Sequence, residues 1–323
     1  MSPVRWVVLV LALILASLLA VSVGTVSIPI SALLNALRGV GEAMPIMVVW
    51  TLRIPRVTLA ILVGAGLGMS GAALQGTMRN PLAEPYLLGV SGGAAVGAVI
   101  GLSLGLGAAL LPLAAFAGAI VAVVAAFFVA HAAGARGDPR VLLMAGVVVG
   151  AFANAAIMVV MANAEPNTVR NALWWMMGSV GDAAWPQIAI LTGYLVVGGG
   201  ALLVVGRQID VLALGEDAAA ALGLDVDAAI RRVFFIASLL AAATVSAAGL
   251  VGFVGLVVPH IVRAAGVRGH RQLLVGSAIT GATLVVLADL LGRVLRPPSE
   301  LPLGAVTALI GVPFFLAKLR RLA

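Results

Sequence analysis

The sequence has no cysteine among its 323 residues. Disulfide bridges, thiol chemistry and cysteine-ligated metal sites are therefore excluded for this chain. Lysine is almost absent too, because Lys318 is the single lysine and Ala317 precedes it. A nucleotide-binding P-loop needs lysine after glycine in the pattern GxxxxGK[ST], so the chain cannot bind ATP through that motif. Any ATP used together with this chain must be hydrolysed on another subunit.

Charge is scarce as well. Only 10% of the residues are charged, 63% are hydrophobic, and the mean hydropathy is +1.20. Uncharged runs cover residues 57–78 and 85–130, which is far longer than a soluble core helix requires. A bilayer crossing takes about 20 apolar residues as a helix, because lipid cannot satisfy the backbone groups of an open strand. We therefore predict an all-α, polytopic membrane protein with a single transmembrane domain, 1–323.

Charges and proline or glycine breaks divide the chain into ten predicted helical segments. These are 4–24, 56–78, 86–104, 111–131, 141–162, 186–206, 231–250, 255–265, 272–293 and 303–319. The eighth segment is too short to cross a bilayer alone and contains Pro259, so it is expected to be a half-length helix packed inside protein. Arg5 before an apolar stretch also fits a signal peptide. A retained first helix is the simpler interpretation, because the uncharged run continues to Leu37.

The basic residues indicate the orientation. An even number of crossings places both termini on one side, and 13 of the 19 basic residues share that side: Arg5, Arg79, Arg136, Arg140, Arg207, Arg231, Arg232, Arg263, Arg268, Arg271, Lys318, Arg320 and Arg321. Cytoplasmic loops carry such an excess, so both termini are predicted to be cytoplasmic. The arginines are scattered among short loops, so no nucleic-acid-binding face is expected.

Six arginines remain on the exported side, namely Arg38, Arg53, Arg56, Arg170, Arg293 and Arg296. One interpretation is snorkelling or local pairing, for example between Asp289 and Arg293 at i,i+4. The other is a basic collar that receives an acidic partner outside the membrane. The residues alone leave both open.

Small residues recur with helical spacing inside two segments. Glycines are spaced by four residues in the third segment, at Gly89, Gly93, Gly97 and Gly101, and Gly64, Gly68 and Ala72 follow the same spacing in the second. Such stripes let neighbouring membrane helices approach closely. We therefore expect tight helix packing at these positions.

Catalytic and metal-binding patterns are weak. The zinc-protease pattern HExxH does not occur, and His131, His260 and His270 lie at the ends of different segments, so structural roles are favoured over metal or haem ligation. An ion-coupled carrier needs titratable residues at depth, and only Asp289 qualifies, near the exported end. No enzyme activity, cofactor or metal is expected in this chain.

The longest predicted cytoplasmic connection, residues 207–230, contains a helix pattern. Gly215 precedes Glu216 and Asp217, an alanine run follows, and Gly223 comes after it. Acidic residues suit a helix N-terminus and glycine ends a helix. A short rigid helix here could receive movement from a motor subunit, or it could be a helical loop without a partner.

Seven ordered stretches carry a family resemblance over nearly the whole chain. They are LRIPRVTLAILVGAGLGMSGAALQG (52–76), RNPLAEPYLLGVSGGA (79–94), LMAGVVVGAF (143–152), WWMMGSVG (174–181), LALGEDAAAALGL (212–224), GLVGFVGLVVPHIVR (249–263) and ELPLGAVTALIGVPFF (300–315). The sequence resembles the FecCD family of ABC importer permeases, which serve iron siderophores, haem and vitamin B12. The resemblance implies ten helices per subunit, a homodimer in the inner membrane of a prokaryote, two separate ATPase subunits that bind Mg-ATP, and a soluble binding protein outside.

The resemblance also implies roles for single residues. Residues within 207–230 match the helix that couples the permease to the ATPase, namely Leu214, Gly215, Glu216, Asp217, Ala218, Leu222 and Gly223. Arg53, Arg56 and Arg293 match positions that meet acidic residues of the binding protein, whereas Arg296 has no such match.

Two further positions resemble a cytoplasmic gate. Asn80 and Leu82 match one side of it, and the loop before the fifth helix supplies the other. There the sequence departs from the family pattern, because Asp138 and Pro139 stand where the vitamin B12 permease has threonines.

The expected function is that of a permease subunit moving an iron chelate, siderophore or haem, into the cytoplasm. Cobalamin is the alternative cargo within the same family. Two other classes stay open at this point: an ion-coupled secondary carrier, and a channel or structural scaffold.

Overall fold

A computed structural model describes residues 3–24, 29–134, 138–267 and 269–319, and this part of the chain is helical without strands. The helices are α1 Pro3–Ser22, α2 Ile30–Leu37, α3 Ala43–Met47, η1 Val48–Arg53, α4 Ile54–Thr77, η2 Pro85–Leu88, α5 Val90–Ser103, α6 Leu111–Ala132, α7 Pro139–Ala162, α8 Pro166–Met176, α9 Trp185–Tyr194, η3 Leu195–Gly199, α10 Gly200–Leu212, α11 Glu216–Ala221, α12 Val226–Ala248, α13 Val254–Ala264, α14 His270–Val294 and α15 Leu303–Leu319. Four arginines used for the orientation, Arg136, Arg268, Arg320 and Arg321, lie outside the described residues.

Each of the ten predicted segments coincides with one or more helices of the structure. Seven spans are long and apolar enough to cross a membrane, with α9, η3 and α10 forming one of them, and α5, α13 and α15 are shorter apolar helices. The expected half-length helix is α13, which has 11 residues. The helices α2, α3 and α8 were not predicted. That all ten segments cross the bilayer stays a prediction.

Helix α4 forms the centre of the molecule, and it packs against α12, α13 and α14. Nearly every residue from Val57 to Thr77 is buried. Small residues make this possible, because a methyl group at Gly64, Gly68 or Gly71 would collide with the backbone of α14 or α13. Close backbone approach through glycine is how membrane helices gain packing contacts without a hydrophobic driving force.

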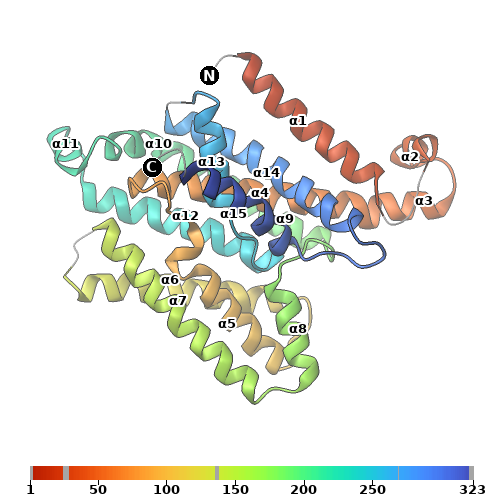
Figure 1. Cartoon of the computed structure of the whole chain (residues 1–323), viewed down its shortest axis with the longest axis horizontal. Coiled ribbons are helices and arrows are strands. Elements are labelled where there is room, and N and C mark those ends of the chain that lie inside the picture. The colour runs from red at the N-terminus through yellow and green to blue at the C-terminus, as the bar shows by residue number, and fades with distance from the viewer. Residues whose placement is uncertain (1–2, 25–28, 135–137, 268, 320–323) are drawn as a thin grey trace.

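Helices α5, α6 and α7 form a second group that packs against α12 (Figure 1). A methyl group at Gly93 would collide with Gly118 of α6, and one at Gly97 would collide with Ala114. Gly89 differs from the rest of the predicted stripe. It lies before α5 with φ +81°, and a Cβ there would be 3.3 Å from the carbonyl oxygen of Gly146 in α7.

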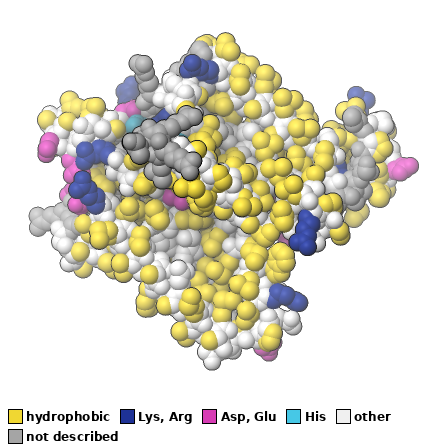
Figure 2. Space-filling view, in the orientation of Figure 1, with side chains coloured by type: hydrophobic (Ala, Val, Ile, Leu, Met, Phe, Trp, Pro, Cys, Tyr) yellow, Lys and Arg dark blue, Asp and Glu magenta, His cyan; other side chains and the backbone are white. Residues whose placement is uncertain are grey.

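The two ends of the molecule carry different elements. Helix α1 begins, and α15 ends, toward the end that carries α11, whereas α2 and α3 lie at the opposite end (Figure 1). Figure 2 shows a broad hydrophobic surface between charged side chains that gather at the edges of this face. Such a surface suits a chain surrounded by lipid.

Candidate functional site

The short helix α11 follows α10 after a turn at residues 213–215. Glu216 and Asp217 occupy its first turn, as the sequence predicts, and Gly215 adopts φ +114° just before it. Gly223, at φ +81°, lies just beyond the C-cap Leu222. Leu214 and Leu222 are two-thirds exposed, at 67% and 66%. The predicted helix is therefore present, and it presents apolar side chains at both ends.

The turn after α4 is held by its own polar groups. The Oδ1 atom of Asn80 accepts a hydrogen bond of 2.9 Å from the backbone N–H of Leu82, which is half-exposed. Asparagine often closes a turn in this way, by bonding to the backbone two residues on. Arg79 adopts φ +47°, a left-handed conformation that is uncommon for residues other than glycine.

Asp138 and Pro139 begin helix α7. The Oδ1 atom of Asp138 accepts a 2.8 Å hydrogen bond from the backbone N–H of Arg140, and Pro139 is the first helical residue. Aspartate at the N-cap and proline at the first position both suit a helix start, because the first N–H groups have no partner within the helix. Asp138 and Pro139 thus start helix α7, and their predicted role in a gate stays a prediction.

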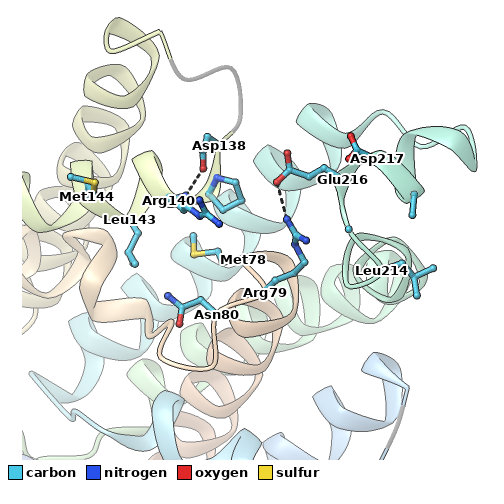
Figure 3. A pocket seen from close by; sticks show the side chains of 13 residues that line it. Met78, Arg79, Asn80, Asp138, Arg140, Leu143, Met144, Leu214, Glu216 and Asp217 are labelled. Atoms are coloured by element: carbon cyan, nitrogen blue, oxygen red, sulfur yellow. Dashed lines mark hydrogen bonds and ion pairs between the residues drawn. The ribbon is translucent and has the colours of Figure 1, made fainter.

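A cleft of about 1010 Å³ brings the turn, the start of α7 and the start of α11 together (Figure 3). Its lining residues are Met78, Arg79, Asn80, Asp138, Pro139, Arg140, Leu143, Met144, Leu214, Gly215, Glu216, Asp217 and Ala218. Three of the four predicted gate residues and five of the seven predicted coupling residues therefore share one cleft. Leu82, Leu222 and Gly223 are outside its lining.

One ion pair crosses this cleft. The Nη2 atom of Arg79 lies 3.3 Å from Oε1 of Glu216, and both side chains are about half exposed. Sequence reasoning placed Arg79 on the cytoplasmic side without assigning it to the site. The two residues are 137 positions apart, and no local pattern signals the contact.

The turn continues into the interior and reaches the start of α13. Oε1 of Glu84 accepts a 2.8 Å hydrogen bond from the N–H of Phe253, and the hydroxyl of Tyr86 accepts one of 2.6 Å from the N–H of Val251. Pro85 lies between them against the first turn of α13, where a Cβ on Gly255 would be 2.8 Å from its Cδ. The sequence did not predict these contacts.

At the opposite end, the three arginines predicted to dock a binding protein lie among acidic groups and carbonyls of this chain. Arg56 donates to both oxygens of Asp289, at 2.8 to 3.1 Å, and to both oxygens of Glu300, at 2.9 and 2.7 Å. The hydrogen bond from Arg56 lowers the pKa of the Glu300 carboxyl, so this carboxyl stays ionised to lower pH than a free glutamate.

The other two arginines of this cluster are buried, each 5% exposed. Arg53 donates to the carbonyls of Val21 and Ser22, both at 2.8 Å. Arg293 forms the anticipated i,i+4 ion pair with Asp289, at 3.1 Å. Local pairing is therefore present in this structure, and docking stays a prediction that the observed contacts do not test.

Comparison with known proteins identifies the family. The model of the FecCD transport family matches residues 11–321. The cobalamin import system permease protein BtuC of Halobacterium salinarum is 42% identical over 87% of this chain and 75% of its own length. The hemin transport system permease protein HmuU of Yersinia pestis is 37% identical, over 83% of this chain and 82% of its own.

A solved structure agrees with these relatives. An inward-facing structure of a putative metal-chelate type ABC transporter superposes with a TM-score of 0.89 at 26% identity, over 99% of this chain and 100% of that one. The described chain thus has the architecture of an ABC permease, with a charged cleft at the end that carries α11. From its sequence and its fold, this chain belongs to the FecCD transport family as an ABC importer permease.

Proposed function

We propose that the chain is the membrane subunit of a binding-protein-dependent importer that carries an iron chelate, siderophore or haem, into the cytoplasm. The family match over residues 11–321 supports this most directly. The relative named for hemin transport and the metal-chelate type structure favour a metal chelate as cargo. The chain would act as a homodimer, in the inner membrane, with both termini and α11 on the cytoplasmic side.

Energy would enter through α11. The exposed Leu214 and Leu222 and the acidic first turn offer an apolar and charged surface to a separate ATPase subunit that holds Mg-ATP. The single observation that carries this mechanism is the cleft, because it places Glu216 and Asp217 beside Asn80 and the start of α7. A movement of α11 would therefore be passed directly to the predicted gate residues that line the same cleft.

The exported end would receive the soluble binding protein. Of Arg53, Arg56 and Arg293, Arg56 is the best candidate for contact with the binding protein, because its side chain is 14% exposed and the side chain of its partner Glu300 is 40% exposed. A carboxylate of the binding protein would meet this surface by charge complementarity. Arg53 and Arg293, which are buried, would then support the local fold around the docking surface.

Uptake into proteoliposomes tests the cargo. The permease, with its ATPase subunits and binding protein, would be offered haemin, ferric citrate or cobalamin in parallel, with ATP enclosed on the cytoplasmic side. We expect haemin or the ferric chelate to accumulate. Cobalamin is the second candidate, because the relative named for cobalamin import is 42% identical. Accumulation of cobalamin alone would replace the iron-chelate assignment.

A further inference from the structure

The structure describes two residues other than glycine with positive φ, Arg79 at +47° and Phe253 at +67°. They lie far apart in the sequence, at the end of α4 and at the start of α13. Residues other than glycine rarely adopt such a conformation, and they keep it where the surrounding contacts hold the backbone in place. Both are tied to the same segment, residues 79–86, which follows α4 and includes the first two residues of η2.

One end of this segment is bonded to α11. Arg79 reaches Glu216 at 3.3 Å, and its guanidinium lies beside Gly215, where an added Cβ would be in ordinary contact with Nη1 at 3.5 Å. The backbone conformation of Arg79 belongs to a turn that Asn80 also holds, through its bond to the N–H of Leu82. The side chain of Arg79 therefore leaves a fixed turn and meets the first turn of α11.

The other end is bonded to the half-length helix. Glu84 accepts from the N–H of Phe253, which is the N-cap of α13, and no side chain from α13 itself caps this end. Tyr86 accepts from Val251, and Pro85 packs on Gly255. Three consecutive residues thus hold the beginning of a helix whose first N–H groups otherwise lack intrahelical partners.

From these contacts we infer that residues 79–86 act as a strut between α11 and α13, with Arg79 and Glu84 as its two positioning residues. Movement of α11 displaces the turn through the Arg79–Glu216 pair, and the turn displaces the start of α13 through Glu84 and Tyr86. The inference deepens the proposed function, since it rests on α11 as the element that receives movement. It implies that α13 moves together with the turn that contains the predicted gate residues Asn80 and Leu82.

Helix α13 is also hydrogen-bonded to α4. Gln75 of α4 donates to the carbonyls of Gly255 and Leu256 at 3.2 Å, and Arg263 donates to Gln75 at 2.6 Å. With α4 packed at the centre, these bonds supply a fixed pivot near the strut. A push at Phe253 would then tilt α13 relative to α4.

Hydrogen–deuterium exchange on the intact chain in lipid nanodiscs tests the strut without ATPase, binding protein or cargo. Glu84→Ala removes the acceptor for the N–H of Phe253 and should raise the exchange of the backbone amides in 249–257 about fivefold, the factor expected for losing one hydrogen bond. Arg79→Glu and Glu216→Arg should each raise it about twofold, because an exposed ion pair stabilises less than a buried hydrogen bond. The double variant Arg79→Glu/Glu216→Arg restores the pair with reversed polarity and should return exchange to the native level.

The matched control is Arg140→Glu, which makes the same charge change in the same cleft. Among the described residues no ion pair joins Arg140 to α11, so exchange at 249–257 should stay native in this variant. Thermal unfolding of each variant excludes global loss of structure, and Arg79→Gln gives a milder removal of the pair. The strut is wrong if the Arg79 and Glu216 variants leave 249–257 unchanged, if the reversed pair fails to restore it, or if Arg140→Glu has the same effect.

A transport measurement separates this inference from the proposed function. In the complex with its ATPase subunits, Arg79→Glu breaks the ion pair while leaving the surface of α11 intact, and it should reduce ATP-driven uptake. If Arg79→Glu leaves uptake unchanged while Glu216→Lys/Asp217→Lys reduces it, α11 couples to the ATPase but the strut does not carry the movement. If neither variant reduces uptake, the coupling role of α11 itself is overturned.

Discussion

Single charged residues define the two ends of this permease. Glu216 and Asp217 in the first turn of α11 lie beside the cleft, and Arg56 lies between two carboxylates at the opposite end. Both environments depend on contacts between residues that are distant in sequence. The roles of these residues are therefore most directly tested by changing charge while keeping the surrounding helices.

The paired change Glu216→Lys/Asp217→Lys tests the coupling role of α11. Two positive charges in the first turn oppose the helix dipole and alter the surface offered to the ATPase. We expect ATP hydrolysis to continue while uptake falls at least tenfold, as measured by the ratio of cargo transported to ATP consumed. Glu216→Gln/Asp217→Asn, which removes charge without reversing it, should show a smaller loss. An unchanged ratio in the lysine variant would contradict the coupling role.

Asp138 is expected to matter for the start of α7. Replacement by alanine removes the acceptor for the N–H of Arg140 and should destabilise this helix end by about 1 kcal/mol. Amide exchange over the first turn of α7 would rise accordingly. Asp138→Asn keeps an N-cap acceptor and should retain most of the protection. Equal exchange in the alanine and native chains would show that the cap is dispensable.

Helix packing through glycine is a property of whole elements. In Gly97→Ala the added methyl group would collide with the backbone of α6 at Ala114, so α5 and α6 would have to separate. Overpacking of this kind costs about 1 to 3 kcal/mol. We expect a lower thermal unfolding midpoint for the purified chain in detergent.

Gly150→Ala is the matched control for this packing prediction. Gly150 lies inside helix α7, and a Cβ there would meet open space. Alanine favours the helix over glycine by up to about 1 kcal/mol, so the midpoint should stay or rise. A midpoint that falls equally in both variants would mean that close approach of α5 and α6 is not the cause.

The sequence predicts the apolar elements well and the polar links poorly. The predicted segments 56–78 and 111–131 lie within two residues of the bounds of α4 and α6, because uncharged runs mark them. The acidic turn and flanking glycines likewise predict α11. Helix α8 was missed, since its sequence is polar for a membrane protein and gives no span signal.

The contacts that join these elements have no sequence signal. Glu300 lies 244 positions from Arg56, and Glu84 lies 169 positions from Phe253. No periodicity in the chain relates such residues, because the tertiary packing of α4, α13 and α14 decides which loops meet. The i,i+4 pair of Asp289 and Arg293 was anticipated for the opposite reason, since one helix places both residues on the same face.

At the scale of the molecule, the chain is a membrane permease whose two ends carry different elements and are proposed to meet different partners. The exposed large hydrophobic side chains are spread over the helices between these ends, as lipid and a second copy of the chain would require. The chain has no P-loop pattern, so in the proposed function ATP would be hydrolysed on another subunit. Dependence of uptake on an ATPase subunit would distinguish the proposed importer from an ion-coupled carrier and from a channel.

The central claim is tested most directly by uptake of haemin, ferric citrate and cobalamin into proteoliposomes that contain the permease, with and without its ATPase subunits. We predict accumulation of a chelate against its gradient only when the ATPase subunits, binding protein and ATP are all present, and no effect of collapsing the membrane potential. Uptake that persists without the ATPase subunits and disappears with the membrane potential would contradict the account and indicate an ion-coupled carrier.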